Sequence, residues 1–165
     1  MVKNFLLTLA LVLACGVSLV AQKAFPTPEL VNLERQAVDL EEVIGQGEPT
    51  VVAVWATWCQ PCHLELDHMA KYREKWEEEY GVTFLAISVD KQHMVKRIQP
   101  LVDRKGWEYD ILVDTDGQLQ TRLGFRSIPQ MYIIDGDGEI VKEFSGYTTG
   151  REHEVDRFLA KLASK

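Results

Sequence analysis

A run of apolar and β-branched residues, TVVAVWA at positions 50–56, limits the fold of this chain more than any other feature. The run has no polar alternation, which is typical of a β-strand buried on both faces. A second run of the same kind, VTFLAISVD, follows at positions 82–90. A sheet built from such strands needs helices on both sides to cover it. We therefore expect an α/β domain.

The segments around these two strands complete the predicted order of elements. Hydrophobic periodicity and the Gly or Pro residues that stop it predict a hairpin-like pair and a helical turn over 30–47, followed by a long helix over 60–80. A helical stretch over 91–105, a short strand over 109–114 and a short helix within 115–125 come next. The chain then forms a hairpin of 130–135 and 139–146 joined by GDG, and a last helix over 149–163. This order predicts a central mixed β-sheet with helices on both faces and an extra N-terminal hairpin.

The first 21 residues differ in character from the rest of the chain. Lys3 is their only charge, and a long apolar run that ends in small residues follows it. This pattern is typical of a secretory signal peptide, and we expect cleavage after Ala21. Two alternatives stay open: VLAC loosely resembles a lipoprotein box with Cys15 as the lipidated residue, and an uncleaved leader would anchor the chain. All three predict export, either to the periplasm or to a membrane from which the domain faces the periplasm.

Composition limits the remaining possibilities. Residues 22–29 are polar with two prolines and predict a short tether, so the folded domain is expected over 30–165. The chain is 46% hydrophobic, which is enough to bury a core. Its formal charge of −7 argues against a nucleic-acid partner, because phosphates are bound by basic patches. We expect a monomer.

Cys59 and Cys62 form a C-x-x-C pair between the first buried strand and the long helix. The positive end of a helix macrodipole stabilises a thiolate, so the pKa of Cys59 is expected to be lowered. Cys62 lies one turn further along, within reach of Cys59. This arrangement predicts that Cys59 attacks a partner disulfide and that Cys62 resolves the mixed disulfide. Pro61 is compatible with the first turn, where its missing N–H costs nothing.

A metal site and an inert structural bridge are the alternatives for this cysteine pair. Zinc needs two further ligands, and the four histidines of the chain show no matching spacing, so no metal site is expected. A disulfide that closes so short a loop stabilises a fold weakly, which argues against an inert bridge. Exchange chemistry is the interpretation that we favour.

Two motifs together carry a family resemblance. VVAVWATWCQPCHLEL, followed later by SIPQMYIIDGDGEIV, resembles the thioredoxin superfamily, and more closely its exported thiol–disulfide oxidoreductases of the TlpA/ResA type. The similarity covers about residues 26–165. It implies a thioredoxin-like fold and a redox-active disulfide between Cys59 and Cys62, with no bound cofactor. It also implies a cis peptide bond between Ile128 and Pro129.

The resemblance assigns expected roles to the residues around the cysteines. Ile128 and Pro129 would expose backbone that pairs with the substrate chain. Trp58 would cover the site and pack on a partner, and Gln60 and Pro61 would adjust the reduction potential. The implied activity is reduction of disulfides in envelope proteins, fed by a membrane electron donor. Clients would be proteins with an oxidised cysteine pair, such as an apocytochrome c.

Glu65 is a second candidate for the chemistry. At about 100° per residue it lies about 60° around the helix from Cys62, on the face expected to be buried. Burial would raise the pKa of this carboxyl group, so that it exchanges protons with the dithiol. Family members carry a glutamate at the matching position, whereas the buried aspartate of cytosolic thioredoxins is replaced here by Ala53. His63 is expected at the surface.

Three rival functions follow from the same motif. An oxidase of folding exported proteins would use the same cysteines, but usually carries an inserted helical domain for which the chain has no room. A thiol peroxidase would carry a Pro and a Thr upstream of its reactive Cys, and here Thr57 is present without the Pro. A non-redox binding module, such as a copper chaperone, would have a wider cysteine spacing and a distal His.

Overall fold

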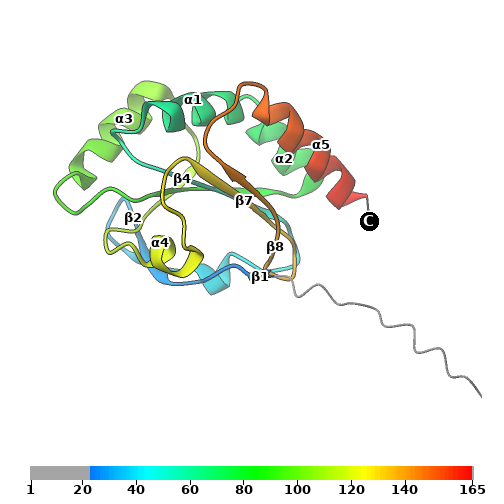
Figure 1. Ribbon diagram of the computed structural model, residues 1–165, viewed down its shortest axis with the longest axis horizontal. Coiled ribbons are helices and arrows are strands. Elements are labelled where there is room, and N and C mark those ends of the chain that lie inside the picture. The colour runs from blue at the N-terminus through cyan, green and yellow to red at the C-terminus, as the bar shows by residue number, and fades with distance from the viewer. Residues whose placement is uncertain (1–22, 165) are drawn as a thin grey trace, which may run out of the picture.

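The protein is described by a computed structural model in which residues 23–164 are defined; the leader and its predicted cleavage or lipidation site lie outside these residues. The strands within these residues are β1 (Lys23–Ala24), β2 (Glu29–Asn32), β3 (Ala37–Asp39), β4 (Thr50–Trp55), β5 (Thr83–Ser88), β6 (Asp110–Val113), β7 (Gln130–Ile134) and β8 (Glu139–Ser145). They form one sheet in the order β1-β8-β7-β4-β5-β6-β2-β3. Figure 1 labels β1, β2, β4, β7 and β8 in this sheet.

The predicted mixed sheet is confirmed. The middle strand, β4, pairs in parallel with β5 and antiparallel with β7, so that Ala53 lies opposite Ala86 on one side and Met131 on the other. Strand β6 continues the parallel part, while β8 and β2 are antiparallel to their neighbours. All six residues of β4 are buried, because both of its faces are covered.

Two cores form on the two faces of β4. Val51, Ala53 and Trp55 belong to one core, whereas Val52 and Val54 belong to the other, as the period-2 alternation of a strand requires. The helical segments are η1 (Leu40–Glu42), α1 (Gln60–Met69), α2 (Arg73–Tyr80), η2 (Val95–Arg97), α3 (Ile98–Lys105), α4 (Gln118–Leu123) and α5 (Arg151–Ala163). Helices α1, α2, α3 and α5 cover the first core, and η1 and α4 cover the second (Figure 1).

The single long helix predicted over 60–80 is wrong, because the chain forms two helices there. In the turn between α1 and α2, the N–H of Lys71 donates to the carbonyl of His68 at 3.3 Å and that of Tyr72 donates to Met69 at 2.9 Å. These are i to i−3 bonds, which tighten the last turn of a helix. The turn contains no Gly or Pro that would mark it in the sequence. The helix predicted over 91–105 is also shorter, since η2 and α3 span 95–105.

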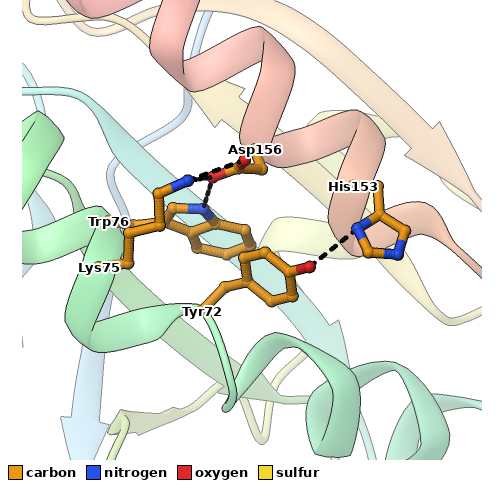
Figure 2. Close-up of polar contacts among 5 residues, drawn as sticks. All are labelled: Tyr72, Lys75, Trp76, His153 and Asp156. Carbon is orange, nitrogen blue, oxygen red and sulfur yellow. Dashed lines mark hydrogen bonds and ion pairs between the residues drawn. The ribbon is translucent and has the colours of Figure 1, made fainter.

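Helix α2 is held by side-chain contacts with α5, which give a physical reason for the break. Asp156 accepts hydrogen bonds from Trp76 Nε1 at 3.0 Å and from Lys75 Nζ at 2.8 Å. Tyr72 and His153 meet nearby, with 2.8 Å between the hydroxyl and Nδ1 (Figure 2). A helix that continued straight from α1 would not be expected to keep these partners.

The N-terminal part is more ordered than expected. The predicted extra hairpin is present as β2 and β3, and β2 extends the sheet by pairing with β6. Residues 22–29, expected as a tether, are packed on the domain in the part that is described. Lys23–Ala24 pairs with β8, and the ring of Phe25 is buried 5.7 Å from that of Tyr132. Within residues 23–164, no helix is long and apolar enough to cross a membrane.

Candidate active site

The Cys59–Cys62 pair lies at the junction between the end of β4 and the first turn of α1. Cys59 is the N-cap of α1, and its Sγ accepts the backbone N–H of Cys62 at 3.3 Å. The two sulfurs are joined in a disulfide, with the Cα atoms 5.3 Å apart. Cys59 is 5% exposed and Cys62 only 1%. A partner sulfur therefore has better access to Cys59, and the unpaired N–H groups of the first helical turn favour a thiolate there.

A buried carboxylate holds the loop that leads to Cys59. Asp90 lies just beyond the end of β5 and accepts hydrogen bonds from the backbone N–H of Thr57 at 2.7 Å and from the Thr57 hydroxyl at 2.8 Å. The Ser88 hydroxyl donates to the same side chain at 2.8 Å. Asp90 is fully buried. Asp90 is not among the residues predicted from the sequence; the available signal was an acidic residue at the end of a mainly apolar strand run.

The residues predicted to meet a substrate lie around the disulfide. Trp58 is 63% exposed, and Gln60 and Pro61 are exposed in the first turn of α1. The Ile128–Pro129 peptide bond is cis, which confirms that prediction. Trp58 and Ile128 line one hollow of about 350 Å³, so the segment before Pro129 lies beside the cysteine motif. Their roles toward a substrate stay predictions.

Glu65 lies on the buried face of α1, as its position around the helix predicted. The side chain is 2% exposed, and no hydrogen bond to its carboxyl group is found within the described residues. Burial raises the pKa of Glu65 to about 7, and the Arg151 guanidinium opposes part of this rise. Arg151 comes from the start of α5, is 8% exposed and packs over the Phe144 ring at 4.5 Å. Sequence reasoning missed this counter-charge because it is distant along the chain.

The prediction that His63 lies at the surface is wrong. The side chain is 6% exposed and packs between two indoles, with ring centroids 6.2 Å from Trp55 and 5.9 Å from Trp107. Burial lowers the pKa of His63, although the backbone of Ala56 opposes this, so the fold favours the neutral imidazole. Its Nε2 atom is buried without a hydrogen-bond partner. The aromatic partners from outside α1 draw this residue inward, which the helix pattern alone does not show.

The groups collected here are suited to thiol–disulfide exchange. Within residues 23–164, no cluster of three or more His, Cys, Asp or Glu side chains is placed to hold a metal ion. The site combines a capped Cys59, a more deeply buried Cys62 and a carboxyl group that can take up or release a proton near pH 7. The fold and this site define a thioredoxin-like thiol–disulfide oxidoreductase.

Comparison with known proteins gives the family. Residues 21–143 match the AhpC/TSA family, and the chain belongs to it. The chain is 32% identical over 130 residues to the thiol-disulfide oxidoreductase ResA of Halalkalibacterium halodurans, covering 79% of this chain and 70% of that one. It is 29% identical over 124 residues to the thiol:disulfide interchange protein DsbE of Haemophilus influenzae, covering 75% and 65% of the two chains.

Solved structures agree with this assignment. A thioredoxin-like protein from Porphyromonas gingivalis has a TM-score of 0.74 at 33% identity, covering 87% of this chain and 94% of that one. A DsbE-type thiol:disulfide interchange protein from Chlorobium tepidum has a TM-score of 0.76 at 18% identity, covering 86% and 96%. The second likeness supports the thioredoxin-like fold alone. Together with the sequence relatives, these findings establish a thiol–disulfide oxidoreductase of the ResA/DsbE type.

Proposed function

We propose that this protein is an exported reductase that transfers electrons from its Cys59–Cys62 dithiol to disulfides of envelope proteins. The observation that carries the proposal is the asymmetry of the pair: Cys59 caps the α1 N-terminus and borders the surface, while Cys62 is buried behind it. An inert bridge would not need one sulfur at a helix N-terminus beside an exposed tryptophan.

The reaction proceeds in two exchange steps. The Cys59 thiolate attacks one sulfur of the client disulfide, which forms a mixed disulfide and releases the other client sulfur as a thiolate. The Cys62 thiolate then attacks Cys59 Sγ, which restores the intramolecular disulfide and releases the second client thiolate. Two electrons pass to the client, and two protons leave the dithiol and end on the client thiols. No bound cofactor takes part.

Glu65 serves as the proton relay for Cys62. The resolving thiol must lose its proton in a setting where it is 1% exposed, so water reaches it poorly. Glu65 lies one helical turn further along and has a pKa of about 7, which lets it change protonation state at the working pH. A carboxylate of ordinary pKa would be a weaker partner for a thiol proton.

The client chain is held by Trp58 and by the segment of Ile128 and Pro129. Trp58 offers an exposed apolar surface, and Ile128 lines the same hollow. An extended client segment beside Pro129 would place its disulfide at Cys59. Suitable clients are proteins with an oxidised cysteine pair, and an apocytochrome c is one candidate. A membrane protein supplies the electrons.

The leader supports export. The apolar segment before Ala21 is expected to direct the chain across a membrane, with release into the periplasm after cleavage or attachment through Cys15 or an uncleaved leader. One solved neighbour of the fold, from Mycobacterium tuberculosis, is described as a secreted disulfide oxidoreductase. That description applies to the neighbour. Export of this protein is tested by cell fractionation of the chain with and without its leader.

Trapping of mixed disulfides is the direct test of this function. Without its resolving thiol, the Cys62→Ser variant should accumulate covalent adducts through Cys59, seen as reducible higher bands after acid quenching of envelope extracts. The matched variant with Cys59→Ser as well should give none. A reduction potential below about −250 mV would support the reductase direction, whereas one near −120 mV would instead indicate an oxidase. Absence of any Cys59 adduct would contradict a protein substrate.

A further inference from the structure

Two hollows border the exposed Trp58, and the Lys and Arg side chains that line them are all basic. The first, of about 350 Å³, is lined by Trp58, Met94 and Ile128 together with Lys91, His93 and Arg126. The second, of about 400 Å³, shares Trp58 and Met94 with it and is also lined by His63, Arg97, Arg104 and Lys105. Neither hollow is lined by an Asp or Glu. We call Lys91, Arg97, Arg104, Lys105 and Arg126 the basic collar.

The basic collar contrasts with the rest of the molecule. The chain carries 25 acidic and 18 basic residues, which gives the formal charge of −7. Another hollow, between α2 and β5, is lined by Glu48, Glu77, Glu108 and Asp110 with one arginine. The patch formed by these two hollows, whose linings contain no Asp or Glu, is therefore a local departure from an acidic surface. Such a patch attracts negative partners and repels positive ones.

Two arginines of the basic collar are available to a partner. Arg97 ends η2 and Arg104 lies in α3 seven residues later, about two helical turns away on the same side. Both are exposed, and neither forms an ion pair within the described residues. Lys105 differs, since its Nζ lies 2.6 Å from the Asp67 carboxylate. A guanidinium presents a fork of donors that matches a carboxylate, so these two arginines fit acidic side chains.

A residue with an unpaired buried nitrogen lines the second hollow as well. His63 contributes to this hollow, and its Nε2 is buried without a hydrogen-bond partner. An unpaired buried nitrogen is unfavourable unless a ligand group completes its hydrogen bond. With the neutral imidazole donating toward the Ala56 backbone, Nε2 is the acceptor, so a client group that donates a hydrogen bond would satisfy it.

We propose that the basic collar selects client proteins whose cysteine pair is flanked by acidic residues. Trp58 and Met94 supply an apolar centre to the contact, and the collar supplies its charged rim, the arrangement of ordinary protein interfaces. An acidic polypeptide is the occupant because the hollows that the collar lines border Trp58, the residue next to the Cys59 that attacks protein disulfides. The proposal rests on the function proposed above and names the class of its substrates.

Exchange with matched peptides tests this selection. The reduced protein is mixed with short disulfide-closed C-x-x-C peptides that differ only in flanking Glu, Ser or Lys residues. At low ionic strength kcat/KM should be about tenfold higher for the Glu peptide than for the Lys peptide, and the ratio should fall toward one in high salt. The double variant Arg97→Glu/Arg104→Glu should abolish or invert the preference.

Controls separate this proposal from the proposed function. The double variant Arg157→Glu/Lys161→Glu makes the same charge change on exposed residues of α5 and should keep the wild-type preference. Hydroxyethyl disulfide, which is small and neutral, should react at the same rate with all variants. Equal rates with all three peptides in the wild type would overturn the selection and leave the oxidoreductase activity standing.

Two further outcomes would overturn, respectively, the client selection by the basic collar and the proposed function. If the wild type shows no peptide preference but binds anionic phospholipid vesicles, and Arg97→Glu/Arg104→Glu loses that binding, the basic collar is a membrane contact rather than a client site. If the reduced protein reacts with neither the peptides nor hydroxyethyl disulfide, the proposed function itself fails.

Discussion

Glu65 shows how burial converts an ordinary acid into a group that titrates near neutral pH. Its pKa moves from 4.5 to about 7 because its side chain is 2% exposed, and Arg151 only partly offsets the loss of hydration. The folded state then binds a proton that the unfolded state has already released between about pH 4.5 and about pH 7. The ionised form is disfavoured in the fold, so the same burial that suits proton transfer reduces stability above this range.

The Glu65→Gln variant tests both consequences. In the wild type, the free energy of unfolding should fall by about 3 kcal/mol as the pH rises from about 4.5 to about 7, and the variant should lack this fall. The variant should also exchange disulfides at least about tenfold more slowly at pH 7, with a flatter pH profile. Urea unfolding and stopped-flow exchange measure the two effects. Glu78→Gln, at an exposed position of α2, is the control; identical pH profiles for wild type and Glu65→Gln would remove Glu65 from the mechanism.

Asp90 holds the loop before Cys59 through its two hydrogen bonds with Thr57. Asp90→Asn keeps the shape of the side chain but turns an amide N–H₂ toward donors, so at least one of its three hydrogen bonds is lost. We expect a loss of about 2 kcal/mol in unfolding free energy. We also expect slower attack by Cys59, because the loop that places it loosens. Rates with hydroxyethyl disulfide and the pH at which Cys59 is half alkylated measure this; an unchanged alkylation profile would make Asp90 purely structural.

At the scale of elements, the break between α1 and α2 separates the redox helix from a structural one. Helix α1 carries Cys62 and Glu65, whereas α2 is attached to α5 through Asp156 (Figure 2). Burial raises the pKa of Asp156, but the hydrogen bonds from Lys75 and Trp76 outweigh it and hold this pKa below its usual range. Asp156 therefore stabilises the fold fully above its pKa in the unfolded chain, and this stabilisation is lost as the pH falls through its lower pKa in the folded protein.

Asp156→Asn tests whether α2 is separate from the chemistry. The variant removes the charge that binds Lys75 and weakens the acceptor for Trp76, so we expect a loss of about 1 kcal/mol in unfolding free energy at pH 7. The difference should shrink in acid, where Asp156 is protonated in the wild type too. Exchange rates should be unchanged. Glu154→Gln, which loses only an exposed contact 3.5 Å from Lys142, should be neutral; a slowed exchange in Asp156→Asn would show that α2 and α1 are coupled.

At the scale of the whole molecule, the sheet extends beyond the expected domain start. Strand β1 adds to β8 at the edge of the sheet, and Phe25 lies in the second core at 4% exposure. The backbone N–H of Phe25 also donates to the carbonyl of Gly138 in the β7–β8 turn at 2.9 Å. Cleavage after Ala21 would leave all of these contacts in the mature protein.

Phe25→Ala measures the contribution of this edge. Removing a buried aromatic ring from the second core should lower the unfolding free energy by about 3 kcal/mol. Lys23→Ala, two residues earlier in β1 and exposed, should change it little. Urea unfolding of the domain that begins at Gln22 provides the comparison. A loss below about 1 kcal/mol would mean that the segment acts as the tether first expected.

The sequence alone determined the class of fold and the location of the chemistry. The two apolar runs require a sheet covered on both faces, and the C-x-x-C pair at a strand-to-helix junction is a local feature whose capping follows from neighbouring residues. The position of Glu65 around α1 could likewise be predicted from local sequence, because it depends on helix periodicity over a single turn. These predictions rest on contacts close along the chain.

The tertiary structure alone decided what depends on distant contacts. Thr57 is bound by Asp90, 33 residues away, and His63 is buried by Trp107 rather than exposed. The basic collar around Trp58 gathers side chains from three separate segments, at 91, 97–105 and 126. Burial, pKa and local charge depend on all the residues that lie nearby in space. The periodicity of one element does not reveal which residues of other elements will lie against it.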